Sequence, residues 1–292
     1  MKKVLIIGSQ GMLGQELVRV FSADAHYEVF GWDKNEIDIT NEARVAEKVS
    51  QLAPAIIINA AAYNAVDAAE EVAGLEEARK LNGLAPKFLA QAAKNVSAIF
   101  VHYSTDYVFD GEKEEGYLES DKPSPISNYG VSKLMGERQA SQVGGQYYLI
   151  RLQKLFGRSG QSPLAKKSFF ETMLSLARSK KEIEVVDEEL ANFTYAPDLA
   201  ERTKYLVEHE LSAGIYHITN EGHPITWFGA VKILFEMAGV KDVKLIPVSS
   251  ARFPRPAKRP KYSVLLNTKL PPMRPWDKAL AEFLIDSQKV AL

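Results

Sequence analysis

The sequence predicts an α/β fold, in which helices cover a doubly wound parallel sheet and a smaller α/β domain lies toward the C-terminus. Short apolar runs alternate with longer helical patterns through the first half of the chain. The runs are apolar on both faces, as the strands of a buried parallel sheet are. A glycine-rich loop, GSQGMLG, follows the first run directly and opens the first helical pattern. That placement is typical of a Rossmann-type, dinucleotide-binding sheet.

The elements follow in chain order. The apolar runs predict strands, which are VLII at 4–7, EVFGW at 28–32, AIIIN at 55–59, AIFVHY at 98–103, YYLIRL at 147–152 and IEVV at 183–186. Helical patterns separate the earlier runs, at 12–22, 41–52, 77–95 and 128–142. After about residue 212 the pattern changes to GIYHIT, a helical stretch near 226–238, VKLIPV, a proline-rich segment and a helix near 275–287.

The change of pattern predicts two domains. The dinucleotide-binding domain is expected to comprise residues 1–151 and 180–213. The substrate-binding domain is expected to comprise residues 152–179 and 214–292.

Composition excludes several classes of function. The 36 basic residues nearly cancel the 37 acidic ones, so no global field attracts nucleic acid or an anionic membrane. The chain has no cysteine, which excludes disulfides and thiolate metal sites and fits the reducing cytoplasm. The start, MKKVLIIG, is too short in apolar residues for a signal peptide, and no run has membrane-spanning length. A monomer and a homodimer both stay open.

The glycine loop is the first candidate site. Gly8, Gly11 and Gly14 let the backbone turn tightly, approach a pyrophosphate and pack the helix on the sheet. The alternative is a tight strand-to-helix connection that binds no ligand. Asp33, at the end of the second strand, is placed to meet an adenosine ribose. Lys34 beside it can instead pair with a 2′-phosphate, so NADH and NADPH both stay open.

A second candidate is the pair Tyr129 and Lys133 in SNYGVSKLMGE. Four residues apart on a helix, the two side chains share one face. A nearby ammonium lowers the pKa of a phenol, so Tyr129 is expected to act as a general acid. The alternative is an ordinary surface helix with a solvated lysine.

The fourth strand ends in HYSTDYVFDG, which places Ser104, Thr105, Asp106 and Tyr107 at the carboxyl edge of the sheet, where open α/β sheets bind ligands. We expect Thr105 and Tyr129 to hydrogen-bond a substrate carbonyl oxygen while a nicotinamide delivers hydride. Turn formation is the alternative role for such strand-end residues. In NAAAYNAVDAAE, small side chains at 60–62 would allow a cofactor to pass closely, unless they simply begin a helix.

The segment from Val243 to Trp276 contains eight basic residues and no acidic one. A basic, proline-stiffened loop suits a substrate diphosphate. RNA binding is disfavoured because only Phe253 and Tyr262 offer aromatic rings for base stacking, and a solvated loop is the other alternative. His217 and His223 have no partners at metal-ligand spacing, so no metal site is predicted.

Together these residues resemble the extended short-chain dehydrogenase/reductases over the whole chain. STDYVFDG, YGVSKLMGE, IDIT at 37–40 and RPKYSVLLNTKL at 259–270 look like the dTDP-4-dehydrorhamnose reductase branch. The resemblance implies NADPH- or NADH-dependent reduction of the 4-keto group of a nucleotide-diphosphate 6-deoxy sugar, first among them dTDP-4-dehydrorhamnose to dTDP-rhamnose. Sugar-nucleotide dehydratases, a sister group, carry Asp-Glu after the threonine, whereas Asp106 is followed here by Tyr107. The base that dehydration needs is therefore missing, and simple reduction is favoured.

The resemblance also implies roles for individual residues. Thr105, Tyr129 and Lys133 match the catalytic triad, and Lys133 also bonds the nicotinamide ribose. The implied cofactor-binding residues are Gly8, Gln10, Gly11, Met12, Leu13, Gly14, Asp33, Lys34, Asp38, Ile39, Ala60, Ala61, Ala62, Tyr63, Asn82, Tyr129 and Lys133, with Asp38 and Ile39 flanking the adenine. The implied substrate-binding residues are Ser104, Asp106, Tyr107, Arg259 and Ser263.

Two segments depart from the branch. Where it usually shows Arg-Thr-Ser-Trp, Arg151 is followed by Leu152, Gln153 and Lys154, so the aromatic wall over the sugar is expected to be missing. DEELANFTYAPDLA replaces the usual Gly-x-Pro-Thr element. These departures leave two alternatives open: an epimerase or reductase of another nucleotide sugar, and a non-catalytic subunit like the regulatory subunit of methionine adenosyltransferase.

Overall fold

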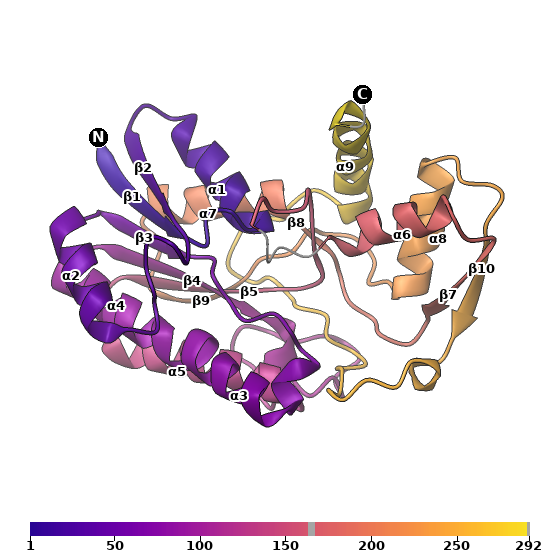
Figure 1. Ribbon diagram of the computed structural model, residues 1–292, viewed down its shortest axis with the longest axis horizontal. Coiled ribbons are helices and arrows are strands. Elements are labelled where there is room, and N and C mark those ends of the chain that lie inside the picture. The colour runs from indigo at the N-terminus through magenta and orange to yellow at the C-terminus, as the bar shows by residue number, and fades with distance from the viewer. Residues whose placement is uncertain (163–166, 291–292) are drawn as a thin grey trace.

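The computed structural model describes residues 1–162 and 167–290, and in these residues the predicted α/β fold class is confirmed (Figure 1). A parallel six-stranded sheet has the order β2-β1-β3-β4-β5-β9. Its strands are β1 (Lys2–Ile7), β2 (Tyr27–Trp32), β3 (Ile56–Asn59), β4 (Ile99–Thr105), β5 (Tyr147–Leu152) and β9 (Gly214–His217). The chain runs outward in one direction from β1 to β2 and in the other from β3 onward. A ligand crevice is therefore expected at the carboxyl ends of β1 and β3.

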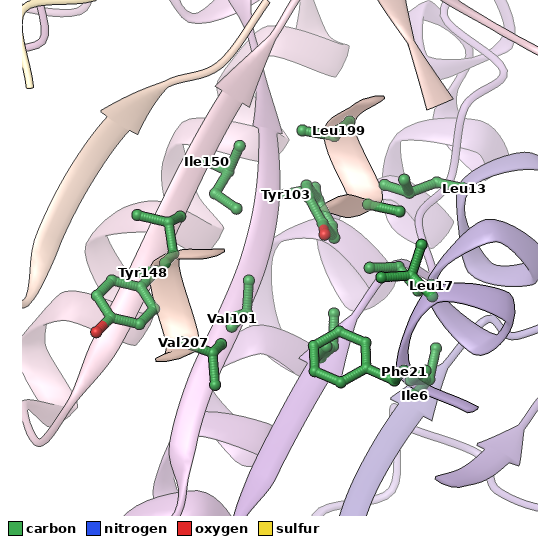
Figure 2. Packing of buried hydrophobic residues seen from close by; sticks show 14 of the residues in the cluster. Ile6, Leu13, Leu17, Phe21, Val101, Tyr103, Tyr148, Ile150, Leu199 and Val207 are labelled. Atoms are coloured by element: carbon green, nitrogen blue, oxygen red, sulfur yellow. The ribbon is translucent and has the colours of Figure 1, made fainter. Parts of the chain in front are cut away.

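Helices cover both faces of this sheet (Figure 1). On one face lie α1 (Met12–Ser22) and α7 (Ala196–Glu208); on the other lie α2 (Glu42–Leu52), α4 (Ala85–Asn95) and α5 (Asn128–Val143). Figure 2 shows the first of these layers, where Leu13, Leu17 and Phe21 of α1 pack toward strand residues such as Val101. The apolar stripes of the helices and the strands apolar on both faces thus bury one another.

The helix predicted over 77–95 is interrupted. The chain forms α3 (Val72–Ala78), then a π-helical segment, Arg79–Leu84, and only then α4. Asn82 lies fully buried in this segment. Its side-chain oxygen accepts a hydrogen bond from the Tyr63 backbone N–H at 2.8 Å, and its side-chain N–H donates to the Tyr63 carbonyl at 3.0 Å. A π-helical turn re-aims side chains, and here it turns an amide toward the loop after β3.

The remaining elements form a second unit beyond the carboxyl edge of the sheet (Figure 1). Its helices are α6 (Phe169–Ala177), α8 (Trp227–Met237) and α9 (Trp276–Val290). Its strands form two parallel pairs, β7 (Glu182–Val186) with β10 (Lys244–Val248) and β6 (Leu155–Phe156) with β8 (Thr194–Tyr195). Short 3-10 turns occur at Ala68–Glu70, Asp106–Val108 and Ser250–Arg252. An aromatic core that includes Phe156, Phe170, Phe193 and Phe283 holds this unit together.

Strand pairing differs from the predicted domain boundaries at two places. Strand β7 was expected in the dinucleotide-binding domain, but it pairs with β10. Strand β9 was expected in the substrate-binding domain, but it pairs with β5 and completes the large sheet. Helix α7, from the segment 180–213, packs on the large sheet. Residues 163–166 and 291–292 of the predicted substrate-binding segments lie outside the described residues.

No helix in the two described stretches combines the length and apolar character needed to cross a membrane.

Candidate active site

A cavity of about 360 Å³ opens at the carboxyl edge of the large sheet. It brings together residues from the glycine loop, the segment after β3, the end of β4, helix α5 and the basic segment. The predicted site residues that line it are Gly11, Met12, Leu13, Ala60, Ala61, Ala62, Ser104, Thr105, Asp106, Tyr107, Tyr129, Lys133 and Ser263. The fold therefore gathers most of the predicted site in one place. The others, Gly8, Gln10, Gly14, Asp33, Lys34, Asp38, Ile39, Tyr63, Asn82 and Arg259, do not line this cavity.

The glycine loop has the geometry of an anion cradle. Gly8 has a φ of +77°, which favours glycine, and a Cβ on Gly14 would lie 2.0 Å from the Gly8 carbonyl oxygen. Gly11 is the N-cap of α1. Among the described residues, no side chain caps this end of the helix, and its first turn contains no acidic residue. The first N–H groups of α1 are thus left for an anion, and a nucleotide pyrophosphate suits them.

Asp33 lies against this loop. Its Oδ2 accepts a hydrogen bond from the Gln10 N–H at 2.8 Å, so the carboxylate stands beside the glycine turn where a ribose is expected. Lys34 and Asp38 are exposed, and Ile39 is buried in the core under α2. Hydrogen bonds from Thr40 lower the pKa of Asp38, which keeps it ionised.

Tyr129 and Lys133 come from the first turns of α5. The Ser127 side chain accepts the Gly130 N–H and fixes where that helix begins. Lys133 is 2% exposed, and its Nζ donates to the Tyr103 carbonyl at 2.6 Å. Burial lowers the pKa of Lys133 to about 8, and Glu137 opposes that shift.

The expectation that Lys133 lowers the pKa of Tyr129 is wrong for this state of the protein. Burial and the charge of Asp106 raise the pKa of Tyr129, and a hydrogen bond with Thr105 only partly offsets them. The shared helical face was inferred correctly, but the ammonium bonds a backbone carbonyl of β4 instead. The phenol is therefore held protonated, as a proton donor must be.

Thr105, Asp106 and Ser263 form a hydrogen-bonded group beside Tyr129. The Thr105 hydroxyl donates to Asp106 Oδ1 at 3.0 Å, and the Ser263 side chain also bonds this carboxylate. Asp106 is 4% exposed, and burial raises its pKa to about 6 despite these bonds. The Tyr107 ring meets the Tyr129 ring edge-on, with centroids 5.6 Å apart. Ser104 Oγ is buried without a partner among the described residues, so it can bond a ligand in the cavity.

The basic segment lines a second cavity of about 740 Å³, which shares Glu189 with the first. Its predicted positive charge is largely neutralised by acids that lie outside the segment. Ion pairs join Lys244 to Glu182, Arg252 to Glu184, Arg255 to Glu189, Arg259 to Asp67, and Arg274 to Asp198 and Glu282. The sequence interval lacks acids, but the folded surface around it does not.

Several residues that line the active-site cavity were not predicted. They include Asn59, Lys154, Glu189 and Trp227. The aromatic wall expected to be missing after β5 has a counterpart, because the start of α8 brings Trp227 to the cavity. Asn59 lies at the end of a predicted strand, and Lys154 and Glu189 lie in the two segments that depart from the related branch, but none of the three was assigned to the site. Trp227 gave no signal, because its place at the cavity depends on long-range packing.

Comparisons with known proteins agree with this geometry. The family model described as "RmlD substrate binding domain" matches residues 1–289. A curated dTDP-4-dehydrorhamnose reductase of Burkholderia thailandensis is 34% identical over 283 residues, covering 92% of this chain and 91% of that protein.

Two solved structures are similar over nearly the whole chain. A dTDP-4-dehydrorhamnose reductase of Clostridium acetobutylicum has a TM-score of 0.91 and 36% identity, covering 98% of this chain and 99% of that one. The same enzyme of Bacillus anthracis, solved in complex with NADP, has a TM-score of 0.91 and 35% identity, covering 98% and 100%.

Proposed function

The chain belongs to the RmlD substrate binding domain family, and we propose that it uses NADPH or NADH to reduce the 4-keto group of a nucleotide-diphosphate 6-deoxy sugar. The first candidate reaction is the reduction of dTDP-4-dehydrorhamnose to dTDP-rhamnose, because the names of its relatives give dTDP-4-dehydrorhamnose as their substrate. The observation that carries the proposal is the cavity in which the glycine loop meets Thr105, Tyr129 and Lys133.

The cofactor is assigned to the glycine loop. Uncapped N–H groups at the start of α1 suit the pyrophosphate, and Asp33 beside Gln10 suits the adenosine ribose. The relative from Bacillus anthracis binds NADP, and exposed Lys34 next to Asp33 offers a charge for a 2′-phosphate. The alanines at 60–62 line the cavity and leave room along the way to Tyr129. A bound nicotinamide supplies the hydride.

The reacting oxygen of the sugar is assigned to Tyr129 and Thr105. The Tyr129 phenol is protonated because burial and Asp106 raise its pKa, so it can donate a proton to the oxygen as negative charge develops there. Thr105 bonds both Tyr129 and Asp106, which orients its hydroxyl in the cavity. Lys133, anchored on the Tyr103 carbonyl, places a positive charge behind this group when protonated.

The diphosphate and nucleotide are assigned to the cavity along the basic segment. It adjoins the active-site cavity at Glu189, and the loop between them supplies Pro260 and Ser263 to one and Arg259 to the other. Lys258, Lys261 and Arg259 line this second cavity. A diphosphate of charge near −2 suits such a group of cations.

The test is a cofactor-oxidation screen with dTDP-, UDP- and GDP-linked 4-keto-6-deoxy sugars. The purified protein should oxidise NADPH or NADH fastest with the dTDP-linked sugar, and Tyr129→Phe should abolish most of that rate. If the protein binds NADPH but oxidises it with none of these sugars, the non-catalytic binding subunit becomes the better reading.

A further inference from the structure

Lys154 occupies an unusual place in the active-site cavity. It lies between β5 and β6 and lines the cavity together with Thr105 and Tyr129. Its φ is +30°, in the left-handed region that a lysine rarely adopts. Such a conformation persists only where the surrounding structure enforces it, and it is commoner at functional sites than elsewhere.

The ammonium of Lys154 has two fixed partners. It donates to the Glu189 carbonyl at 2.8 Å and to the Ile225 carbonyl at 3.2 Å. An ammonium carries three N–H donors. Among the described residues, no acceptor is recorded for the third. When Lys154 is protonated, one of its N–H groups in the cavity thus has no hydrogen-bond acceptor among the residues that the structure describes.

Trp227 is fixed next to this cation. The Lys154 Nζ lies 4.4 Å from the centroid of the Trp227 ring. The indole N–H donates to Glu189 Oε2 at 2.9 Å, and Arg255 bonds the other oxygen of that carboxylate. Glu189 thus holds the indole in place and has its own charge matched by Arg255. The carboxylate of Glu189 is therefore engaged by other donors and does not form an ion pair with Lys154.

The charge of Lys154 is only partly balanced. Burial lowers its pKa to about 7, while Glu189 and Asp106 oppose the shift. Asp106 in turn bonds Thr105, so the electrostatic influence of Lys154 extends to the reacting group. A donor with these neighbours is well placed to bond an oxygen atom close to the carbon that is reduced.

We propose that Lys154 is a specificity-determining residue that donates its third N–H to a ring hydroxyl of the substrate sugar, whose apolar face packs on Trp227. This inference rests on the proposed function and narrows its substrate to sugars that keep that hydroxyl. Lys154 thus brings a hydrogen-bond donor to the cavity from the link after β5, and Trp227 brings an aromatic ring from the start of α8.

The test compares three sugars with three proteins. The sugars are a dTDP-4-keto-6-deoxy sugar and its 2-deoxy and 3-deoxy analogues. The proteins are the parent, Lys154→Met, and the control Lys269→Met. Lys269 likewise donates to a carbonyl, that of Ile215 at 2.7 Å, and lies 5.1 Å from the Tyr216 ring. Although it belongs to the basic segment, it lines neither the active-site cavity nor the cavity assigned to the diphosphate.

For the parent, removing the hydroxyl that accepts the hydrogen bond from Lys154 should lower kcat/KM by about tenfold to a hundredfold, the range for a hydrogen bond to a charged group. Lys154→Met should lower kcat/KM by a similar factor on the full sugar, mainly through KM. On the analogue that lacks this hydroxyl, Lys154→Met should cause no further loss. Lys269→Met should follow the parent on all three sugars.

Two contrary outcomes can be told apart. If the parent is active but Lys154→Met loses the same factor on every sugar, Lys154 only clamps the Glu189 and Ile225 carbonyls and the inference is overturned. If the parent reduces none of the three sugars, the proposed function is itself wrong, and the role proposed for Lys154 is then also wrong.

Discussion

The guanidinium of Arg259 forms a bidentate ion pair with the carboxylate of Asp67, with N–O distances of 2.6 and 2.7 Å. The pair ties the basic segment to the loop after β3, across 192 residues of sequence. Arg259 also donates to the Ala257 carbonyl, and the bonds to Asp67 lower the pKa of that carboxyl. A substrate diphosphate that binds Arg259 must therefore share this guanidinium with Asp67.

Arg259→Ala should raise KM for the nucleotide sugar by roughly tenfold to a hundredfold and change kcat much less, because it removes a charged contact made equally in ground and transition states. Asp67→Asn is the matched variant. It leaves the cation in place and removes its competitor, so KM should stay level or fall. If both variants raise KM alike in steady-state assays, the pair organises the loop and Arg259 is not a phosphate ligand.

Gly11→Val should weaken NADPH binding at least tenfold in calorimetry, since a branched side chain would stand where a pyrophosphate must approach α1. A Cβ on Gly11 would lie 3.2 Å from the Gly8 carbonyl oxygen, a tight contact that requires a small shift of the loop. The melting temperature without cofactor should therefore fall slightly, and the loss of NADPH affinity should exceed what that fall accounts for. An unchanged affinity would remove the cofactor from this loop.

Tyr129→Phe should lower kcat by about 10²- to 10⁴-fold, the usual contribution of a positioned acid, with NADPH affinity unchanged. Tyr107→Phe provides the comparison, because its ring meets Tyr129 edge-on and lines the same cavity. It should lose far less in single-turnover assays. Equal losses in the two variants would argue against Tyr129 as the proton donor.

Asp106→Asn should increase stability near neutral pH. The pKa of Asp106 is raised from 3.8 to about 6, so the folded state holds a proton that the unfolded state releases between those values. Stability contributed by this group is therefore lost as pH rises through that window. Urea unfolding should show the variant gaining roughly 3 kcal/mol on the parent between pH 4 and pH 7.

Asp121→Asn is the control of opposite sign. A bond from Lys113 lowers the pKa of Asp121, so its contribution is present above the unfolded pKa and is lost as pH falls. If the difference in the free energy of unfolding between the parent and Asp106→Asn does not change with pH, the raised pKa of Asp106 is contradicted.

Glu137→Gln should destabilise the protein by about 3–5 kcal/mol, because it leaves the Arg151 cation buried without its counter-charge. The two side chains are 3% and 1% exposed, and Arg151 Nη2 lies 2.7 Å from Glu137 Oε2. Glu47→Gln, in an exposed pair with Arg44, should change stability by less than about 1 kcal/mol. Denaturant titrations of the two variants measure the contrast directly, and similar values would refute it.

The sequence by itself determined the class of the fold and predicted which side chains make up the candidate reacting group. Apolar runs, the glycine spacing in GSQGMLG and the four-residue interval between Tyr129 and Lys133 are local patterns. Each pattern is fixed by the geometry of one strand, one turn or one helix, so it can be recognised in the sequence without knowledge of the tertiary structure.

Tertiary structure alone decided which distant segments meet. Strands β7 and β9 exchanged their predicted domains because pairing depends on which edges are available, and an apolar run does not encode its neighbour. The basic segment acquired its acids from elsewhere, as Arg259 did from Asp67. Lys154 and Trp227 entered the cavity from separate elements. The raised pKa of Tyr129 has the same origin, because burial and a neighbouring carboxylate are properties of the packed molecule rather than of any interval in the sequence.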